Sequence, residues 1–500
     1  MSPAVAVAAP SEAAADAGEQ VARAGGNAVD AAIAAGLVTM VNEVGIVSPS
    51  SGGFLTVQPA DGSAPQTVDG WMDMPGRGLR GDDRRGTGTW DVRTVYGGGV
   101  TVTIGPGSVA THGAIAAMGE AHARWGRAPW RELVAPAIDV ARGGFRLSSA
   151  SRYYLGHVHD SIFGWDPASR AAVHDLDGRI TTDPVIVPDL AATLEVVAGV
   201  GPRALHEGDL ARAISDDVLG RGGLLTPEDL AAYLPVVRPA LVARLGPWTL
   251  GTNPPPAVGG VCVAAMLRLL DGHPRPPLVD GTWSADDVAH LVRVQRAVLG
   301  ARLDRLDVTD DLVAEAAALL DTIDTGGIAA LESGSTAHVS AADADGATCA
   351  LTVSSGYGSG MVAAGTGIWL NNCLGEQELN PRGLHGLPPG TRLLSNMAPT
   401  VGHHVDGSAL AIGSPGADRI TTAIVQAVAG LVNGGLELQE AINHPRVHVH
   451  RAGRAEEEVK VESEPSMYFG GVAATFRGAD GRLEAAADPR RDGAVRLVRG

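Results

Sequence analysis

Hydrophobic and polar positions in the first forty residues predict one strand followed by two helices. Residues 4–9 form a short apolar run typical of a buried strand. Ser11 is placed to cap a helix over about residues 12–24, which a glycine pair ends. The next helix, over about residues 27–40, is apolar on almost all sides. That pattern indicates a helix buried between two layers.

The pattern changes twice further along the chain. Residues 51–57 and 66–69 have the pattern of two strands joined by a turn. Residues 107–320 are mostly helical in pattern, with glycine- and proline-rich loops between the helices and a strong helix over about 284–303. From residue 336 onwards the pattern is that of short strands. We therefore expect mixed helices and sheets, with the strands at the two ends.

A hairpin follows the glycine-rich stretch that ends at residue 335. Residues 336–343 and 347–355 alternate in polarity and flank an Ala-Asp-Gly turn. A three-residue loop with glycine in the left-handed position places Thr336 opposite Ser354. A two-residue loop would pair Thr336 with Ser355 instead, so the register depends on the turn.

A strand-to-helix turn lies at residues 413–418. It follows a short apolar strand at residues 409–412 and precedes an apolar-periodic helix over about residues 419–432. Backbone N–H groups exposed at such a turn are suited to receive the negative oxygen of a tetrahedral intermediate.

Composition and charge exclude several classes of protein. The 500 residues are 45% hydrophobic, which is enough for a large core and two or more parts. The net charge of -18 repels nucleic acid and anionic membranes, so neither is an expected partner. The single lysine, Lys460, excludes a Walker-type phosphate loop and argues against a pyridoxal phosphate enzyme. We therefore expect no cofactor.

The cysteines and the amino terminus indicate a reducing compartment. Cys262, Cys349 and Cys373 are far apart and odd in number, which is typical of buried thiols and not of disulfides or a zinc site. No signal peptide is evident, and no apolar run reaches the length of a spanning helix. We expect a cytoplasmic protein.

The junction between Ser335 and Thr336 carries the main chemical hypothesis. If the chain cleaves itself there, the new terminal threonine has a hydroxyl nucleophile and an α-amine base on one residue. The hydroxyl would attack the Ser335 carbonyl, and the resulting ester would hydrolyse. The freed α-amine, with a reference pKa of about 7.7 to 8.0, would then act as the general base.

Several motifs together resemble those of the gamma-glutamyltranspeptidase family. They occur in one order as GGNAVDAA at 25–32, TAHVS at 336–340, GSG at 358–360, LNN at 370–372, MAPT at 397–400, GSPG at 413–416 and DPR at 488–490. The resemblance implies an α+β fold, the four-layer αββα sandwich of the amino-terminal-nucleophile hydrolases. It also implies autocleavage into a large subunit, residues 1–335, and a small subunit, residues 336–500.

The resemblance assigns roles to individual residues. Thr336 is the implied nucleophile, and Thr352 and Ser354 match hydroxyls that steer it. Gly416 and Ala417 match the backbone oxyanion donors, where an alanine is acceptable because only its N–H is used. The implied substrate-binding residues are Glu376, in place of an aspartate that binds an α-ammonium group, and Ser395 and Asn396, in place of a Ser-Ser pair that contacts a carboxylate.

Two positions depart from the family pattern. Trp71 aligns with the arginine that clamps the substrate carboxylate, and an indole cannot form that bidentate ion pair. Cys373 replaces a side-chain amide, and the segment between Glu376 and Ser395 is too short for the lid of some members. The implied activity is therefore hydrolysis or transfer of a small amide, either gamma-glutamyl or a bulkier acyl amide.

Two other functions remain open. A carbon-carbon bond hydrolase of an antibiotic pathway would use the same Thr336, and the loss of the arginine at Trp71 is compatible with that change. An uncleaved, non-catalytic relative would instead bind a ligand. In one version of this hypothesis, a metal ion binds at the alternating histidines His444, His448 and His450. The family carries a similar passage as structure, so we predict no metal site.

Overall fold

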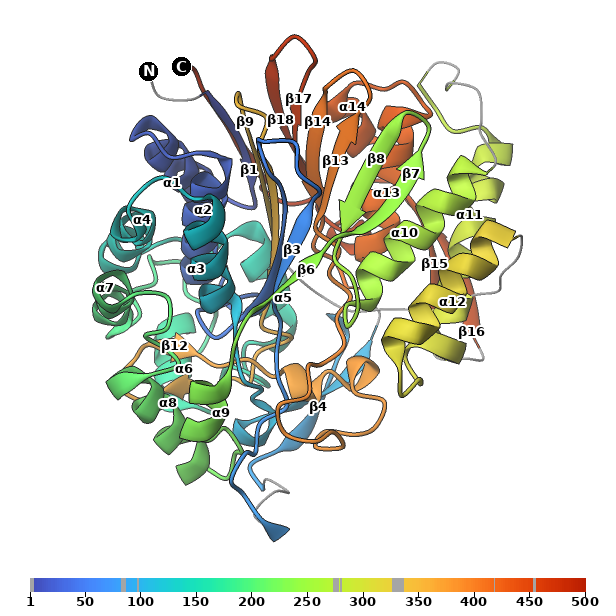
Figure 1. Cartoon of the computed structure of the whole chain (residues 1–500). Coiled ribbons are helices and arrows are strands. Elements are labelled where there is room, and N and C mark those ends of the chain that lie inside the picture. The colour runs from blue at the N-terminus through green and yellow to red at the C-terminus, as the bar shows by residue number, and fades with distance from the viewer. Residues whose placement is uncertain are drawn as a thin grey trace.

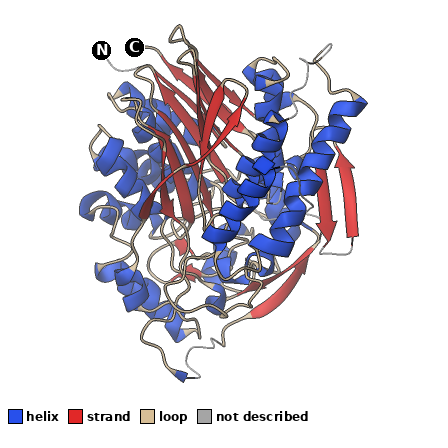
Figure 2. Ribbon diagram, turned by 45° about the vertical axis from the view of Figure 1, so that its right-hand side comes forward, coloured by secondary structure: helices blue, strands red, loops and turns tan. Residues whose placement is uncertain are grey.

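Helices and strands are mixed throughout the molecule. The computed structural model describes residues 4–81, 87–96, 99–272, 278, 281–325, 337–417, 419–452 and 456–500. Two large sheets lie at the centre with helices on either side (Figures 1 and 2). The expectation of an α+β protein is confirmed. No helix within the described ranges is long and apolar enough to cross a membrane.

The larger sheet combines strands from both ends of the chain in the order β19-β1-β9-β10-β2-β3-β6, with each neighbouring pair antiparallel. Its strands are β1 (Val5–Ala9), β2 (Gly52–Gln58), β3 (Gln66–Gly70), β6 (Val236–Pro239), β9 (Ala337–Asp343), β10 (Thr348–Ser354) and β19 (Ala494–Val498). The central strands β1, β9, β10 and β2 are buried along their whole length. Burial on both faces requires cover on both sides.

The second sheet covers one of those faces. Its order is β18-β17-β14-β13-β8-β7, and its strands are β7 (Leu241–Leu245), β8 (Trp248–Thr252), β13 (Thr400–His404), β14 (Ala409–Gly413), β17 (Ala473–Arg477) and β18 (Leu483–Ala487). Ala350, Val401 and Ala411 meet between the two sheets and are fully buried. Such small side chains let the sheets approach closely.

Helices cover the outer faces of both sheets (Figure 1). On the first sheet lie α1 (Glu12–Arg23), α2 (Ala28–Asn42) and α3 (Ala114–Trp125), with α4 (Trp130–Gly143) against α2. On the second lie α10 (Val258–Asp271), α13 (Arg419–Val432) and α14 (Leu438–Asn443), with α11 (Ala285–Ala301) and α12 (Leu312–Thr325) against α10. All of α2 is buried, which confirms the predicted helix between layers.

The remaining elements lie around the two sheets and the helices that cover them (Figure 1). They are the helices α5 (Ser149–Val158), α6 (Pro167–Val173), α7 (Leu190–Val200), α8 (Gly208–Gly220) and α9 (Pro227–Ala232), and the hairpins of β4 (Trp90–Thr94) with β5 (Val100–Ile104), β11 (Val362–Ala363) with β12 (Ile368–Trp369), and β15 (Val447–Ala452) with β16 (Glu456–Val461). The expectation of a mostly helical region over 107–320 missed β6, β7 and β8. Those strands are four or five residues long. β6 pairs with the distant β3 and β8 with the distant β13, while β7 joins the sheet through its hairpin with β8.

Candidate active site

The strand that follows the candidate cleavage point begins at Ala337. Ser335 and Thr336 themselves lie outside the described residues. Asp343 donates its N–H to the carbonyl of Ala347 at 3.0 Å, so the predicted three-residue loop is confirmed. Ala337 pairs with Val353 in the resulting ladder. Ser354, the next residue of β10, is 1% exposed and accepts a hydrogen bond from Gly356 N at 3.1 Å.

A buried polar network lies directly beneath this strand end. His338 Nδ1 lies 2.8 Å from Thr352 Oγ1, and His338 Nε2 lies 2.8 Å from Ser340 Oγ. Ser340 donates to the carbonyl of Ala473 at 3.1 Å, so its oxygen is the acceptor toward the ring. We therefore assign the proton to Nε2, and Nδ1 accepts from Thr352. We call His338, Ser340 and Thr352 the histidine network.

The histidine network is neutral and tightly enclosed. Burial lowers the pKa of His338 to about 3, so the ring carries no charge at neutral pH. A Cβ atom on Gly413 would lie 2.3 Å from the ring, so only glycine leaves room for it there. His338 lies in the TAHVS motif, but nothing in the sequence alone indicates a role for it. The packing of Gly413 of β14 against the ring of β9 is visible only in three dimensions.

The turn after β14 presents two backbone donors. Ser414 Oγ donates to Pro415 O at 2.6 Å and accepts from Gly471 N at 3.1 Å, which holds the turn in place. Within the described part of the chain, neither the N–H of Gly416 nor that of Ala417 donates a hydrogen bond. Gly416 has φ 126° and Ala417 has φ 64°. The turn thus has the two unengaged N–H groups that an oxyanion site requires.

The conformation of Ala417 changes one expectation. The resemblance predicts that an alanine here is equivalent to glycine because only its N–H is used. At φ 64° the Cβ of an L-residue is crowded, which costs roughly 1–2 kcal/mol. The substitution is therefore not neutral for the backbone, even though the N–H is kept. Strain of this kind is often found at functional sites.

Glu376 is a buried carboxylate without a nitrogen or oxygen donor. It is 1% exposed, and no hydrogen bond from such a donor reaches either oxygen within the described residues. Burial raises its pKa well above the usual range and nearby Glu378 adds to the rise, while the Cys373 thiol opposes it. A Cβ atom on Gly356 would lie 3.1 Å from Glu376 Oε1. The carboxylate is therefore close to the chain segment that begins at Ser354.

Ser395 and Asn396 lie beside the start of α10. Ser395 forms a parallel bridge with Ala257, and its Oγ accepts from Met397 N at 3.3 Å. The side chain of Asn396 is 3% exposed, and both its oxygen and its nitrogen lack a partner among the described residues. Buried amides normally have partners, so an unpaired one next to Ser395 indicates a place for a ligand.

Trp71 and Cys373 belong to one apolar cluster, together with Phe54 and Met397. The Trp71 ring stacks on Phe54 with centroids 6.2 Å apart, and its Nε1 donates to Leu394 O at 2.8 Å. Trp71 is 2% exposed, so its indole N–H is used inside the protein. This position offers no cation to a substrate carboxylate.

Arg392 is a nearby cation that the sequence did not suggest. Its guanidinium bonds Asp69 at 2.7 Å and Asp73 at 2.6 Å, and it also reaches the hydroxyl of Tyr233, which donates to Trp71 O. These carboxylates neutralise it. Arg392 therefore braces the segment around Trp71 and does not replace the family arginine.

The alternating histidines do not converge on a common point. His448 Nδ1 lies 3.1 Å from Thr422 Oγ1, and His444 Nδ1 lies 3.0 Å from Pro445 O. Among the residues that the structure describes, no group of three or more His, Cys, Asp or Glu side chains could hold a metal ion.

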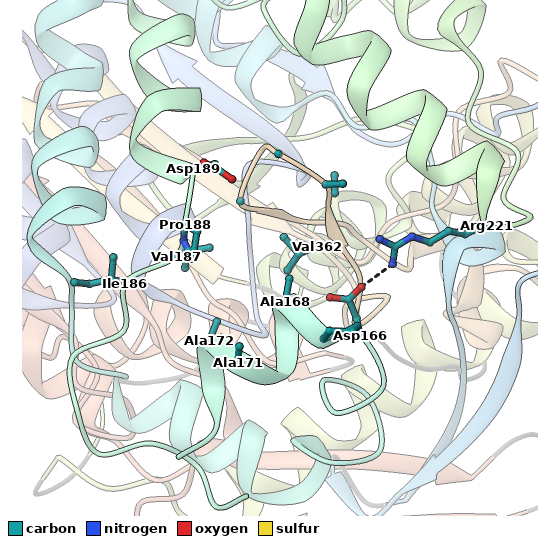
Figure 3. Close-up of a pocket in the computed structure, with 15 residues that line it drawn as sticks. Asp166, Ala168, Ala171, Ala172, Ile186, Val187, Pro188, Asp189, Arg221 and Val362 are labelled. Atoms are coloured by element: carbon teal, nitrogen blue, oxygen red, sulfur yellow. Dashed lines mark hydrogen bonds and ion pairs between the residues drawn. The ribbon is translucent and has the colours of Figure 1, made fainter. Parts of the chain in front are cut away.

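A cavity of about 360 Å³ lies elsewhere, between α6, the segment 186–189 and the turn after β11 (Figure 3). Asp166 and Arg221 form an ion pair of 2.6 Å at its edge. None of the predicted site residues is among the residues that line it. We therefore place the candidate active site at the ends of β9, β10 and β14.

Comparisons with known proteins identify the family and support the fold described above. The family model of gamma-glutamyltranspeptidase matches residues 14–498. The acylase ACY 1 proenzyme of Pseudomonas sp. (strain V22) is 30% identical over 530 residues, covering 97% of this chain and 92% of the relative. The glutathione hydrolase proenzyme of Escherichia coli (strain K12) is 27% identical and covers 95% and 88%. The crystal structure of cephalosporin acylase from Bacillus halodurans superimposes with a TM-score of 0.81 over 100% of this chain and 96% of that one, at 21% identity, which shows a shared fold.

Proposed function

Since this chain belongs to the gamma-glutamyltranspeptidase family, a family of hydrolases and acylases, we propose that it is a self-cleaving hydrolase or acyltransferase of small amides with Thr336 as its nucleophile. One observation carries the proposal. Among the described residues, the N–H groups of Gly416 and Ala417 are unengaged, and their turn directly follows β14. Gly413 of β14 packs on the ring of His338, and His338 is two residues after Thr336 in the sequence. This contact supports a nucleophile at Thr336 that lies close to an oxyanion site at the turn after β14.

Maturation proceeds through an ester. The Thr336 hydroxyl adds to the Ser335 carbonyl, the C–N bond breaks, and the acyl group moves from nitrogen to oxygen. Water then hydrolyses the ester, which leaves a carboxylate on Ser335 and a free α-amine on Thr336. The products are residues 1–335 and 336–500, held together as the four-layer sandwich of the amino-terminal-nucleophile hydrolases.

Turnover repeats the same chemistry on a substrate. The Thr336 hydroxyl attacks the amide carbonyl while its α-amine takes the hydroxyl proton and passes it to the leaving amine. The N–H groups of Gly416 and Ala417 stabilise the oxyanion. Thr352 and Ser354 orient the nucleophile. Attack of water on the acyl ester completes hydrolysis, and attack of a second amine completes transfer.

The substrate is proposed to be a bulkier acyl amide and not a gamma-glutamyl one. Trp71 provides no positive charge for an α-carboxylate, and Arg392 is already paired with two aspartates. Glu376 retains the capacity to bind an ammonium group, and Asn396 offers a free amide. The similarity to an acylase proenzyme over nearly the full chain supports an acyl group other than glutamyl.

A denaturing gel and a mass spectrum test the proposal. Purified wild-type protein is expected to give two fragments, the smaller beginning at Thr336, and Thr336→Ala is expected to stay as one chain. After incubation with acyl p-nitroanilides, the smaller fragment should carry an acyl adduct. A single uncut wild-type band would refute the proposal. Two fragments with no amide turnover would instead favour the carbon-carbon bond hydrolase, which Trp71 also permits.

A further inference from the structure

A second cavity, of about 260 Å³, lies against the segment that joins Glu376 to Ser395. Residues 379–394 form one wall, Pro256 forms another, and the chain between α11 and α12 closes it from the opposite side. Its lining is rich in leucine and proline, including Leu306, Leu312, Leu379, Leu387, Leu394 and Pro256. Such a lining is suited to an apolar group.

Two of the three walls of this cavity are joined to residues of the candidate substrate site. Asn380 Nδ2 donates to Cys373 O at 2.8 Å and to Glu376 O at 3.0 Å. Leu394 accepts the Trp71 indole hydrogen bond and precedes Ser395. On the other wall, Pro256 precedes Ala257, which forms the bridge to Ser395. These contacts connect the cavity to the candidate substrate site, although the residues of that site do not themselves line it.

One buried polar atom of the lining is left without a partner. The charged side chains at the edge are paired, since Asp307 bonds Arg302 at 3.0 Å, Arg382 bonds Asp310 at 2.5 Å and Arg392 bonds two aspartates. Asn380 is 7% exposed, and its Nδ2 is fully used by the two carbonyls. Its Oδ1 has no partner within the described part of the chain. An unpaired buried acceptor favours a ligand that donates a hydrogen bond.

We propose that this cavity binds the apolar part of the amide substrate, an aliphatic or aromatic group with one hydroxyl or N–H that donates to Asn380 Oδ1. The inference rests on the proposed function and specifies its substrate class. It also accounts for Trp71, because a substrate held by its apolar part needs no cation at that position. Specificity then depends on shape and one hydrogen bond.

The test uses p-cresol, an apolar ring with one hydroxyl donor, and 4-methylanisole, which has the same ring without the donor. Binding to the purified wild-type protein is measured by calorimetry. We expect p-cresol to bind and 4-methylanisole to bind about fivefold more weakly, because one hydrogen bond to a buried acceptor is worth roughly 1 kcal/mol. Equal affinity for the two probes would overturn the role of Asn380.

Leu312→Trp should fill the cavity from the start of α12, where Leu312 is only partly buried. We expect it to weaken p-cresol binding by at least about tenfold. The matched control is Ile186→Trp, which adds the same ring at an exposed residue of the other cavity (Figure 3) and should leave the affinity unchanged. Equal p-cresol binding to the wild type and Leu312→Trp would overturn the proposal.

A kinetic measurement links the cavity to the active site. p-Cresol should raise the KM of an acyl p-nitroanilide and leave kcat unchanged, since it occupies the substrate's position. Binding at the cavity without any effect on KM would overturn its assignment as a substrate subsite. Failure of the proposed function has a different signature, a single uncut band on the gel, and the calorimetric comparison of the variants remains readable in that case.

Discussion

The two sides of the candidate active site differ in whether their buried polar atoms have hydrogen-bond partners. In the histidine network, both ring nitrogens of His338 have partners at 2.8 Å. On the substrate side, both atoms of the Asn396 amide and both oxygens of Glu376 lack a nitrogen or oxygen partner among the described residues. A buried group left unpaired costs about 1–3 kcal/mol. Buried polar atoms thus lack partners, at a cost in folding stability, where a ligand is expected to bind. They have partners where catalytic groups must be positioned.

The largest expected effect comes from breaking the histidine network. His338→Leu removes the partner of Thr352 and Ser340 together. We expect self-cleavage and kcat to fall about 100-fold, because small misplacements of reacting groups cause losses of that size. The rates are measured by a gel time course and by p-nitroanilide hydrolysis.

His338→Gln is the matched control for this change, since an amide can accept from Thr352 and donate to Ser340. It should restore most of the rate. The wild-type ring is already neutral above a pKa of about 3, so the pH profile of kcat between about 5 and 9 should not shift in the variant. If leucine and glutamine gave equal rates, the network would have only a packing role.

The next effect concerns the unpaired carboxylate. Because the pKa of Glu376 is raised, part of the population is protonated at pH values where an exposed glutamate is charged. Binding of an ammonium-bearing amide requires the charged form, so its KM should fall as pH rises. Glu376→Gln should remove this pH dependence and raise that KM about tenfold. A neutral acyl amide is the control substrate, and an equal effect on both would contradict an ammonium site.

A matched pair of stability measurements sharpens the contrast between the two sides. Thr352→Val removes a satisfied hydroxyl and leaves His338 Nδ1 unpaired, so the free energy of unfolding should drop by about 1–3 kcal/mol. Asn396→Leu removes an amide that has no partner and should leave the stability of the ligand-free protein unchanged or higher. Both are measured by denaturant unfolding. Similar losses of stability in the two variants would contradict the contrast between the paired histidine network and the unpaired substrate side.

The smallest effect is expected at the oxyanion turn. Ala417→Gly relieves the crowding at φ 64°, but glycine loses more backbone entropy on folding. The two contributions oppose each other, so the net change in stability should stay within about 1 kcal/mol. Since the N–H is kept, kcat should change by less than about threefold. A larger fall in kcat would mean that the alanine methyl group itself contacts the substrate.

Local patterns predicted the parts of the fold that depend on neighbours in sequence. The capped helix α1, the buried helix α2, the β9–β10 hairpin with its register, and the strand-turn-helix at β14 and α13 follow from periodicity and turn residues. The short strands β6, β7 and β8 did not, because β6 pairs with β3, β8 pairs with β13, and β7 joins the sheet through β8. Propensity is a weak guide where distant pairing decides the structure.

The candidate site, like the fold, could be predicted from the sequence only in part. Ser354 and the turn at Gly416 were reached from hairpin geometry and from the N–H groups of a strand-to-helix turn. The role of His338 depends on the room that Gly413 leaves in another sheet, and the cavity at Asn380 depends on walls from three segments. No spacing along the chain encodes such contacts. They become visible only once the sheets are packed.

The position of β1 has a consequence for the timing of maturation. β1 is the first described strand of the chain, yet it pairs with β9 on one side and with β19 on the other, with Val5 opposite both Asp343 and Val498. A ribosome adds about 5–20 residues per second, so β19 leaves it roughly 25 to 100 seconds after β1. The sheet that holds β9 is completed only after β19 has been made. Self-cleavage is therefore expected only after synthesis has passed residue 498.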